Sequence, residues 1–127
     1  MIVDTDVLVW YMRGDKRARD KLRRLGAFSV SAVTHMELIQ GMRDRGELEA
    51  LKGFLRSRGV NVVGISEKMS DRAVFYMEQH FLGHNLRMAD ALIGATAWVL
   101  GEPLLTGNVR HYRVLKDIKL VKFRTSG

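Results

Sequence analysis

Short apolar segments with strand character alternate with helical segments along the chain, and this alternation limits the folds available to it. Strands are expected at about residues 1–3, 27–33, 60–65, 103–106 and 119–123. Strands that alternate with helices form a parallel sheet with helices on both faces. The sequence therefore predicts an α/β fold, a three-layer αβα sandwich around a mostly parallel sheet of four to five strands.

Capping residues set the expected helix boundaries. Asp6 is the expected N-cap of a helix that ends near Met12, and Thr34 is that of a helix running to about Arg43. The segment 87–100 is apolar on nearly every side, which is typical of a helix that is buried all round.

The length of 127 residues suits one domain, expected to span residues 1–124 with a flexible end at 125–127. The chain has no cysteine, which excludes disulfides, thiolate metal sites and cysteine nucleophiles. No targeting segment is visible, and the most apolar stretch, 91–100, is shorter than the ~20 residues that span a bilayer. We therefore expect a soluble, cytoplasmic protein without a membrane segment.

The chain is basic, with 21 Lys and Arg against 14 Asp and Glu, a net charge of +7 and a pI near 10.1. A basic domain of this size is often built to approach a polyanion, most commonly nucleic acid. Excess basic residues also serve simply to solubilise a surface. The two most basic segments, 16–24 and 110–122, fit a solvated helical face as well as a binding surface, so charge alone leaves both readings open.

Four polar side chains stand near the ends of expected strands or the starts of expected helices; these are Asp4, Glu37, Asp90 and Asn108. Such positions gather at the crevice beyond the carboxyl ends of parallel strands, where ligands bind. Three of them also have local explanations. Glu37 would complete a capping box with Thr34, Asp90 would complement a helix dipole, and Asn108 would cap a short helix.

Three carboxylates that converge on one crevice require a counterion. Two like charges roughly 4 Å apart repel by about 4 kcal/mol at an effective dielectric constant of about 20. Convergence of Asp4, Glu37 and Asp90 therefore predicts a divalent cation, and oxygen ligands without cysteine favour Mg²⁺ or Mn²⁺. Such a cation in a basic protein indicates phosphodiester hydrolysis.

Four segments, in order, resemble those of the PIN-domain ribonucleases, and within that group most of all the VapC-type toxins of toxin–antitoxin pairs. They are MIVDTDVLV at 1–9, THMEL at 34–38, MADALIGATA at 88–97 and LTGNVRHY at 105–112. The resemblance covers nearly the whole chain, and the ordered set is more specific than any one segment.

This resemblance implies a catalytic site in which Asp4, Glu37 and Asp90 bind Mg²⁺ or Mn²⁺ and act in the cleavage of single-stranded or looped RNA. Asn108 matches the family's fourth acidic position, where an amide adds no charge and argues against a second tightly held metal. Thr106 matches a hydroxyl residue that helps to order the site.

The resemblance further implies that Asp6 is a supporting position, that the protein is a homodimer, and that a cognate VapB-like antitoxin covers the active-site groove with its tail. Phe75, Tyr76 and Phe81 lie on a helix with more large apolar residues than one side can bury. They are expected to be core or dimer contacts, with part of this helix in the dimer interface.

Two other functions fit parts of the sequence. The opening Ile2–Asp6 resembles that of haloacid-dehalogenase-like phosphotransferases, in which Asp4 would be the nucleophile, although a downstream lysine followed by an acidic pair is lacking. A non-catalytic RNA-binding or interaction module, with its acidic residues acting only as helix caps, is the second alternative. The histidines show no metal-ligand spacing and are expected to be structural or surface residues.

Overall fold

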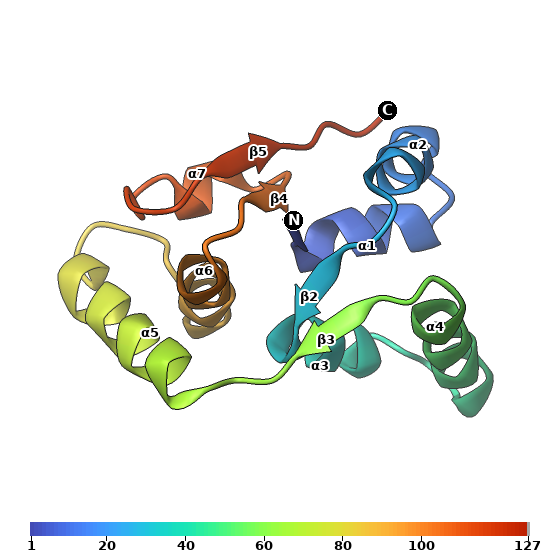
Figure 1. Cartoon of the computed structure of the whole chain (residues 1–127), viewed down its shortest axis with the longest axis horizontal. Helices are drawn as coiled ribbons and strands as arrows, with labels where there is room; N and C mark the ends of the chain where they lie inside the picture. Colours follow the sequence, from blue (N-terminus) through green and yellow to red (C-terminus); the bar gives the residue numbers. More distant parts are fainter. Residues whose placement is uncertain (127) are drawn as a thin grey trace.

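Five parallel strands form one sheet in the order β3-β2-β1-β4-β5 (Figure 1). The computed structural model describes residues 1–126. The strands are β1 (Ile2–Val3), β2 (Ser29–Ser31), β3 (Asn61–Val63), β4 (Leu104–Thr106) and β5 (Leu120–Lys122). The predicted parallel sheet is confirmed, and β1, the first strand in sequence, lies at its centre.

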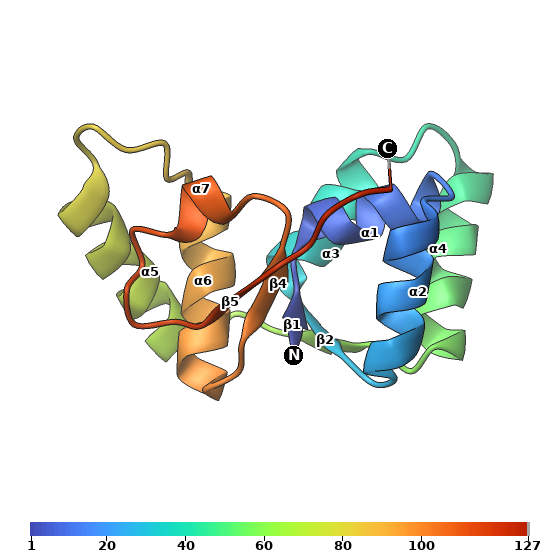
Figure 2. The ribbon, with the colours of Figure 1, turned by 90° about the horizontal axis from the view of Figure 1, so that it is seen from above.

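Helices cover both faces of this sheet. They are α1 (Thr5–Met12), α2 (Lys16–Leu25), α3 (Ala32–Gln40), α4 (Arg45–Ser57), α5 (Glu67–His80), α6 (Met88–Leu100) and α7 (Val109–Tyr112). Figure 2 shows α5, α6 and α7 on one side of the strands and α1, α2 and α4 on the other. Helix α3 contacts both α1 and α6. The expected three-layer sandwich is therefore present.

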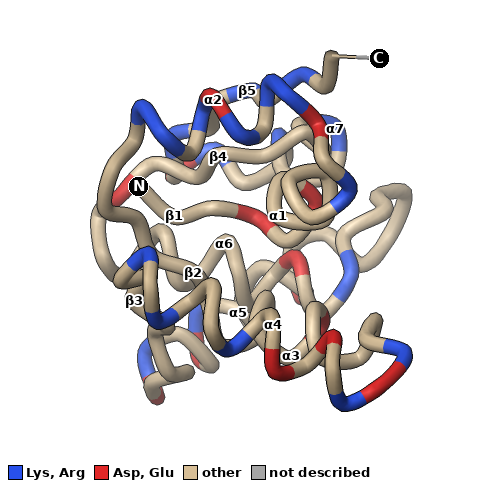
Figure 3. Tube along the Cα trace, turned by 90° about the vertical axis from the view of Figure 1, so that its right-hand side faces the viewer, with Lys and Arg blue, Asp and Glu red and all other residues tan. Residues whose placement is uncertain are grey.

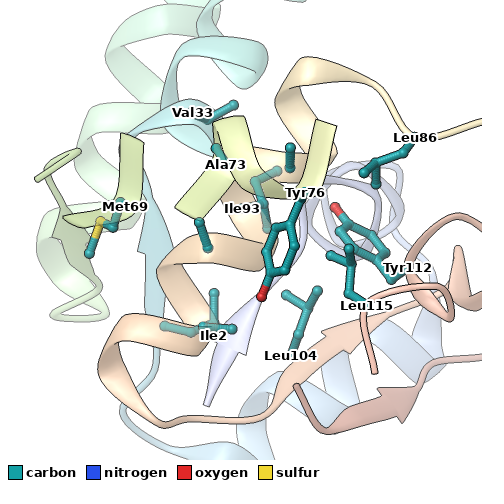
Figure 4. Close-up of a cluster of buried hydrophobic side chains, with 13 residues drawn as sticks. Ile2, Val33, Met69, Ala73, Tyr76, Leu86, Ile93, Leu104, Tyr112 and Leu115 are labelled. Carbon is teal, nitrogen blue, oxygen red and sulfur yellow. The ribbon is translucent and has the colours of Figure 1, made fainter. Parts of the chain in front are cut away.

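Alternation along the central strands divides the core into two clusters. Ile2 and Leu104 pack toward α5 and α6, whereas the next residues, Val3 and Leu105, pack toward α1, α2 and α4. Figure 4 shows the first cluster, in which Tyr112 approaches the sheet from α7.

Helix α6 is enclosed on most sides, as its apolar sequence predicts. Seven of its residues are buried, from Asp90 to Ala97. At Gly94, an added Cβ would lie 2.6 Å from a methyl group of Leu115, so this helix packs closely against the segment after α7. Among the helices of residues 1–126, none combines the length and the apolar character that crossing a bilayer requires.

Two predicted helix starts are wrong. Asp4, not Asp6, caps α1, and its side chain accepts a hydrogen bond of 2.8 Å from the N–H of Thr5. Ser31, not Thr34, caps α3, so Thr34 lies inside the helix and forms no capping box with Glu37. Strands β1 and β2 are so short that the chain enters α1 and α3 directly from the ends of these strands.

The three aromatic residues expected in the core or in a dimer interface divide between buried and exposed positions. Tyr76 is buried in the core, and its hydroxyl donates a hydrogen bond of 2.8 Å to Asp117. Phe75 and Phe81 are 42% and 69% exposed, so they remain available on the surface.

The end of the chain lies against the start of α2. Arg17 donates to the carbonyl oxygen of Thr125, and Ser126 donates from its backbone N–H and its hydroxyl to Asp15. Gly127, the last residue of the expected flexible end at 125–127, lies outside the described residues.

Candidate active site

The candidate site lies at the carboxyl edge of the two central strands. Asp4 directly follows β1, and Thr106 ends the neighbouring strand β4. The chain passes from β1 to β2 on one side, and from β3 across to β4 on the other, so the strand order reverses between β1 and β4. In open parallel sheets this reversal opens the crevice in which ligands bind.

Asp4 is held by three donors from three parts of the chain. Its Oδ1 accepts from the N–H of Thr5 at 2.8 Å and from the hydroxyl of Tyr112 at 3.2 Å. Its Oδ2 accepts from the hydroxyl of Thr106 at 2.7 Å. The carboxylate of Asp4 is only 4% exposed. Its orientation is therefore fixed by the fold.

Burial and the neighbouring carboxylate of Asp6 raise the pKa of Asp4 to about 7, against the opposing effect of its hydrogen bonds. Burial also raises the pKa of Asp6. The two carboxyl groups stand at the start of α1 without a Lys or Arg paired to either one among residues 1–126. These two carboxyl groups thus lack a neutralising Lys or Arg among the described residues.

Glu37 is connected to Asp4 through hydrogen bonds of Thr5. The hydroxyl of Thr5 donates to Glu37 Oε1 at 2.6 Å and lies 3.0 Å from the hydroxyl of Thr34. Thr5 therefore touches Glu37 with its side chain and Asp4 with its backbone. One residue thus contacts both of these predicted site carboxylates.

Asp6 connects the start of α1 to the loop after β4. Its Oδ2 accepts a hydrogen bond of 2.9 Å from the N–H of Gly107, whereas its Oδ1 is buried and has no partner within residues 1–126. A Cβ at position 107 would lie 2.5 Å from Oδ2, so only glycine permits this close approach.

Asp90 lies in the first turn of α6 and is 4% exposed. Its Oδ2 accepts from the N–H of Arg87 at 3.2 Å, and the Nε atom of Arg87 is 3.5 Å away. The Nδ1 atom of His111 lies 3.7 Å from the same oxygen and has no hydrogen-bond partner within residues 1–126.

Asn108 stands at the N-cap position of α7, but its side chain makes no capping hydrogen bond. Its backbone N–H donates to the hydroxyl of Thr106 at 2.9 Å, which orients that hydroxyl toward Asp4. The capping explanation of Asn108 therefore lacks its main interaction.

Tyr112 lies near the aspartates that come from different elements of the site. Burial raises the pKa of its hydroxyl well above the ordinary value, and the charges of Asp4, Asp90 and Asp6 act in the same direction. All three aspartates thus lie near one buried phenol. Within residues 1–126, no three His, Cys, Asp or Glu side chains are close enough together to form a metal site as they stand.

Comparison with known families decides the relationship. The profile of the PIN domain matches residues 1–116, a span that includes every residue described in this site. The chain belongs to the PIN-domain family.

Individual PIN-domain relatives match the chain over nearly its whole length. Ribonuclease VapC10 of Mycobacterium tuberculosis (strain ATCC 25618 / H37Rv) is 36% identical over 125 residues, which cover 94% of this chain and 90% of the relative. Ribonuclease VapC1 of Methanocaldococcus jannaschii is 28% identical over 121 residues, which cover 94% of this chain and 84% of the relative.

Solved structures with the same PIN-domain architecture support the fold. A toxin–antitoxin complex from Klebsiella pneumoniae matches with a TM-score of 0.80 at 24% identity, covering 95% of each chain. VapBC2 from Rickettsia felis, bound to a DNA fragment from its promoter, matches with a TM-score of 0.81 at 19% identity, covering 97% of this chain and 98% of that chain.

PIN-domain nucleases of the VapC type generally depend on a divalent metal ion. The residues of this site fit such an ion. Asp4 is a buried acid and Asp6 a half-buried one, both with raised pKa values, and Oδ1 of Asp6 is a buried acceptor without a partner among the described residues. The acidic side chains offer oxygen ligands alone, which is the donor set that hard divalent cations prefer.

Three residues that touch the predicted carboxylates were missed in the sequence. Thr5 bridges Asp4 and Glu37, Tyr112 donates to Asp4, and Gly107 donates to Asp6. Each lies within a segment that carries the family resemblance, but only Thr5 stands beside acidic residues in the sequence. His111, expected to be structural or on the surface, lies 33% exposed beside Asp90.

Proposed function

We propose that this PIN-domain protein is a metal-dependent endoribonuclease and the toxin of a VapBC-type toxin–antitoxin pair. The main observation in support is the buried Asp4 at the carboxyl edge of β1, whose pKa is raised to about 7. Its neighbour Thr5 also contacts Glu37, and its neighbour Tyr112 also lies near Asp90. The 36% identity to a VapC ribonuclease supports RNA as the substrate.

In this proposal Asp4, Glu37 and Asp90 are the catalytic metal ligands, and Mg²⁺ or Mn²⁺ is the ion. When bound, the ion polarises a phosphate oxygen and activates the attacking water for hydrolysis of the phosphodiester bond. Thr5 and Thr106 hold the carboxylates of Glu37 and Asp4 in fixed orientations through their hydroxyls. Such pre-organisation lowers the cost of assembling the site around the substrate.

Asn108, Thr106 and Asp6 have supporting roles in the proposal. Thr106 orients Asp4 directly, and Asp6 ties α1 to the loop after β4 through Gly107. The exposed amide of Asn108 offers a neutral oxygen ligand or a hydrogen-bond donor at the entrance.

A cognate antitoxin and a second copy of the chain complete the proposed assembly. A groove of about 820 Å³ borders Glu37, and apolar side chains such as Leu38, Met42 and Phe54 line it. This groove suits the tail of a VapB-like antitoxin, and a solved structure that shares the fold, VapBC2 from Rickettsia felis, is a VapBC complex. Exposed Phe75 and Phe81 are the proposed contacts of a homodimer. A cytoplasmic location, where RNA is available, belongs to the same proposal.

The other functions are less well supported. A phosphotransferase with Asp4 as nucleophile is not favoured by the family match over residues 1–116. A module whose acidic residues only cap helices is disfavoured by Glu37, whose side chain forms no capping hydrogen bond and accepts from Thr5 instead.

Incubation of the purified protein with single-stranded RNA tests the proposal. Cleavage is expected with Mg²⁺ or Mn²⁺, with none in EDTA and none in Asp4→Asn. Asp20→Asn, on the exposed surface of α2, is the matched control and should cleave at the wild-type rate. Metal-independent cleavage, or equal activity in Asp4→Asn, would show that the proposal is wrong.

A further inference from the structure

A polar cavity of about 430 Å³ opens beside the candidate active site, between the loop after α5 and the segment that contains α7. Its polar lining side chains are His84, Asn85, Asn108, Arg110, His111 and Arg113. All lining side chains are therefore neutral or basic. A volume of this size falls within the range of sites for small molecules and suits one nucleotide unit.

Arg110 and Arg113 supply the permanent positive charge of this cavity. Within residues 1–126, neither guanidinium lies within salt-bridge distance of a carboxylate, whereas Arg43 is paired with Glu47 at 2.7 Å. Unpaired guanidinium groups on a concave surface attract anions, and their planar donors match the oxygens of phosphate.

The cavity is continuous with the carboxylate site. His111 lines the cavity, and its Nδ1 atom lies 3.7 Å from Asp90 Oδ2. Asn108 also lines it, and its backbone N–H orients the hydroxyl that holds Asp4. An anion in the cavity would therefore lie next to the bond that the carboxylates act on. Figure 3 shows a second concentration of Lys and Arg along α2, a different part of the surface.

We infer that this cavity binds a backbone phosphate of the RNA strand adjacent to the cleaved bond, with Arg110 and Arg113 as its ligands. The inference rests on the proposed function, since it assigns a substrate contact to the same site. In this arrangement the RNA strand crosses α7 on its way from the cavity to the carboxylates.

The salt dependence of RNA binding tests this inference. Binding of a labelled single-stranded oligoribonucleotide is measured by fluorescence anisotropy in EDTA, so that cleavage does not interfere. Arg110→Gln with Arg113→Gln should weaken binding about tenfold. The slope of log K against log salt should become shallower by about 0.7, the value for one lost phosphate contact on a single strand. Arg110→Lys with Arg113→Lys keeps the charge and should retain most of the slope.

Arg23→Gln with Arg24→Gln, on the exposed last turn of α2, removes the same charge and is the matched control. It should change affinity less than twofold. Equal slopes in the cavity variant and wild type, an equal loss in the control, or no RNA binding by wild type would overturn the inference. So would a selective loss of polyglutamate binding, which would indicate an acidic protein partner.

The two proposals can fail separately. If wild type binds RNA through this cavity but never cleaves it with Mn²⁺, the proposed function is wrong and the inference stands. If wild type cleaves RNA and the cavity variant binds RNA normally, the inference is wrong and the proposed function stands. Melting temperatures of the variants confirm that each one is folded.

Discussion

The hydroxyl of Tyr112 donates a hydrogen bond of 3.2 Å to Asp4 Oδ1, joining two residues 108 positions apart. Because the N–H of Thr5 donates to the same oxygen, both lone pairs of Oδ1 are occupied. Oδ2 accepts only from Thr106 and keeps one lone pair free for a ligand. A buried phenol thus selects which oxygen of Asp4 faces the crevice.

Tyr112→Phe tests this selection. The variant keeps the packing and loses one hydrogen bond to a buried carboxylate, so we expect unfolding free energy to fall by about 1–2 kcal/mol. The affinity for Mn²⁺ should fall several-fold in titration calorimetry, because Asp4 is no longer held in one rotamer. Tyr11→Phe, on α1 and outside this network, is the control. Unchanged Mn²⁺ affinity in Tyr112→Phe would contradict the role assigned to its hydroxyl.

Asp4, Glu37 and Asp90 should behave as one unit. Asp4→Asn, Glu37→Gln and Asp90→Asn are each expected to lower the rate of RNA cleavage by at least 10²-fold, and double variants should be little worse than single ones. Cleavage kinetics at saturating Mn²⁺ measure this. Losses that multiply in a double variant would show that its two residues act independently. Near wild-type cleavage by Asp90→Asn would show that Asp90 does not act with Asp4 and Glu37.

The raised pKa of Asp4 predicts how stability depends on pH without metal. Its pKa is about 7 in the folded protein against 3.8 as the ordinary value, so between about pH 4 and 7 the folded state binds the extra proton. Stability from this group is therefore lost as pH rises through that window, by about 4 kcal/mol at most. The melting temperature in EDTA should fall from pH 5 to pH 7.5.

Adding Mn²⁺ and substituting Asp4 both test whether Asp4 causes this pH dependence. Mn²⁺ should raise the melting temperature at pH 7.5 and have little effect at pH 5, where Asp4 is protonated. Asp4→Asn should flatten the pH profile and melt higher than wild type at pH 7.5 in EDTA. A profile that is the same in Asp4→Asn and wild type would assign the pH dependence to other residues.

Asn108→Asp adds a fourth carboxylate at the entrance of the site. Affinity for a hard cation rises with the charge of its ligands, so we expect Mn²⁺ to bind the variant several-fold more tightly. Asn61→Asp, on the edge strand β3, is the control and should not change the affinity. If calorimetry gives equal affinities for Asn108→Asp and wild type, Asn108 does not belong to the metal site.

Gly107→Ala tests the contact between α1 and the loop after β4. The added methyl group would lie 2.5 Å from Asp6 Oδ2, so either the loop or the carboxylate must move. We expect the melting temperature to fall by several degrees and cleavage to fall at least tenfold. At Gly64 the same change meets no atom within 4 Å and should have little effect. A Gly107→Ala variant as active as Gly64→Ala would show that this contact is dispensable.

Much of the fold followed from the sequence, because apolar periodicity is local and strong in this chain. The buried helix α6 and the parallel strands were predicted correctly. The starts of α1 and α3 were not, since several good capping residues stand close together and only strand length decides among them. With β1 only two residues long, the helix begins at Thr5 and leaves Asp6 inside it.

The acidic candidates stood out in the sequence, and the family resemblance indicated Thr106 as a support, whereas Thr5, Tyr112 and Gly107 were not identified. Asp4 interrupts an apolar segment and was the one candidate without an expected capping role, which singled it out, although in the structure it caps α1. Thr5 and Tyr112 act through tertiary hydrogen bonds, and no periodicity or spacing reports which hydroxyl will meet which carboxylate. Glu37 was assigned a cap that does not form because the helix starts three residues earlier, at Ser31.

The central place of β1 in the sheet has a consequence for biosynthesis. Asp4 leaves the ribosome first, but its partners Thr106 and Tyr112 lie on the last strand–helix unit before β5. At about 5–20 residues per second, several seconds pass between the synthesis of Asp4 and that of Tyr112. A nascent chain that still lacks β4 has one open side of β1 and an unsupported Asp4. The environment of Asp4 is thus completed only after the segment from β4 to α7 has been synthesised, so the order of synthesis separates this carboxylate from two of its three hydrogen-bond donors.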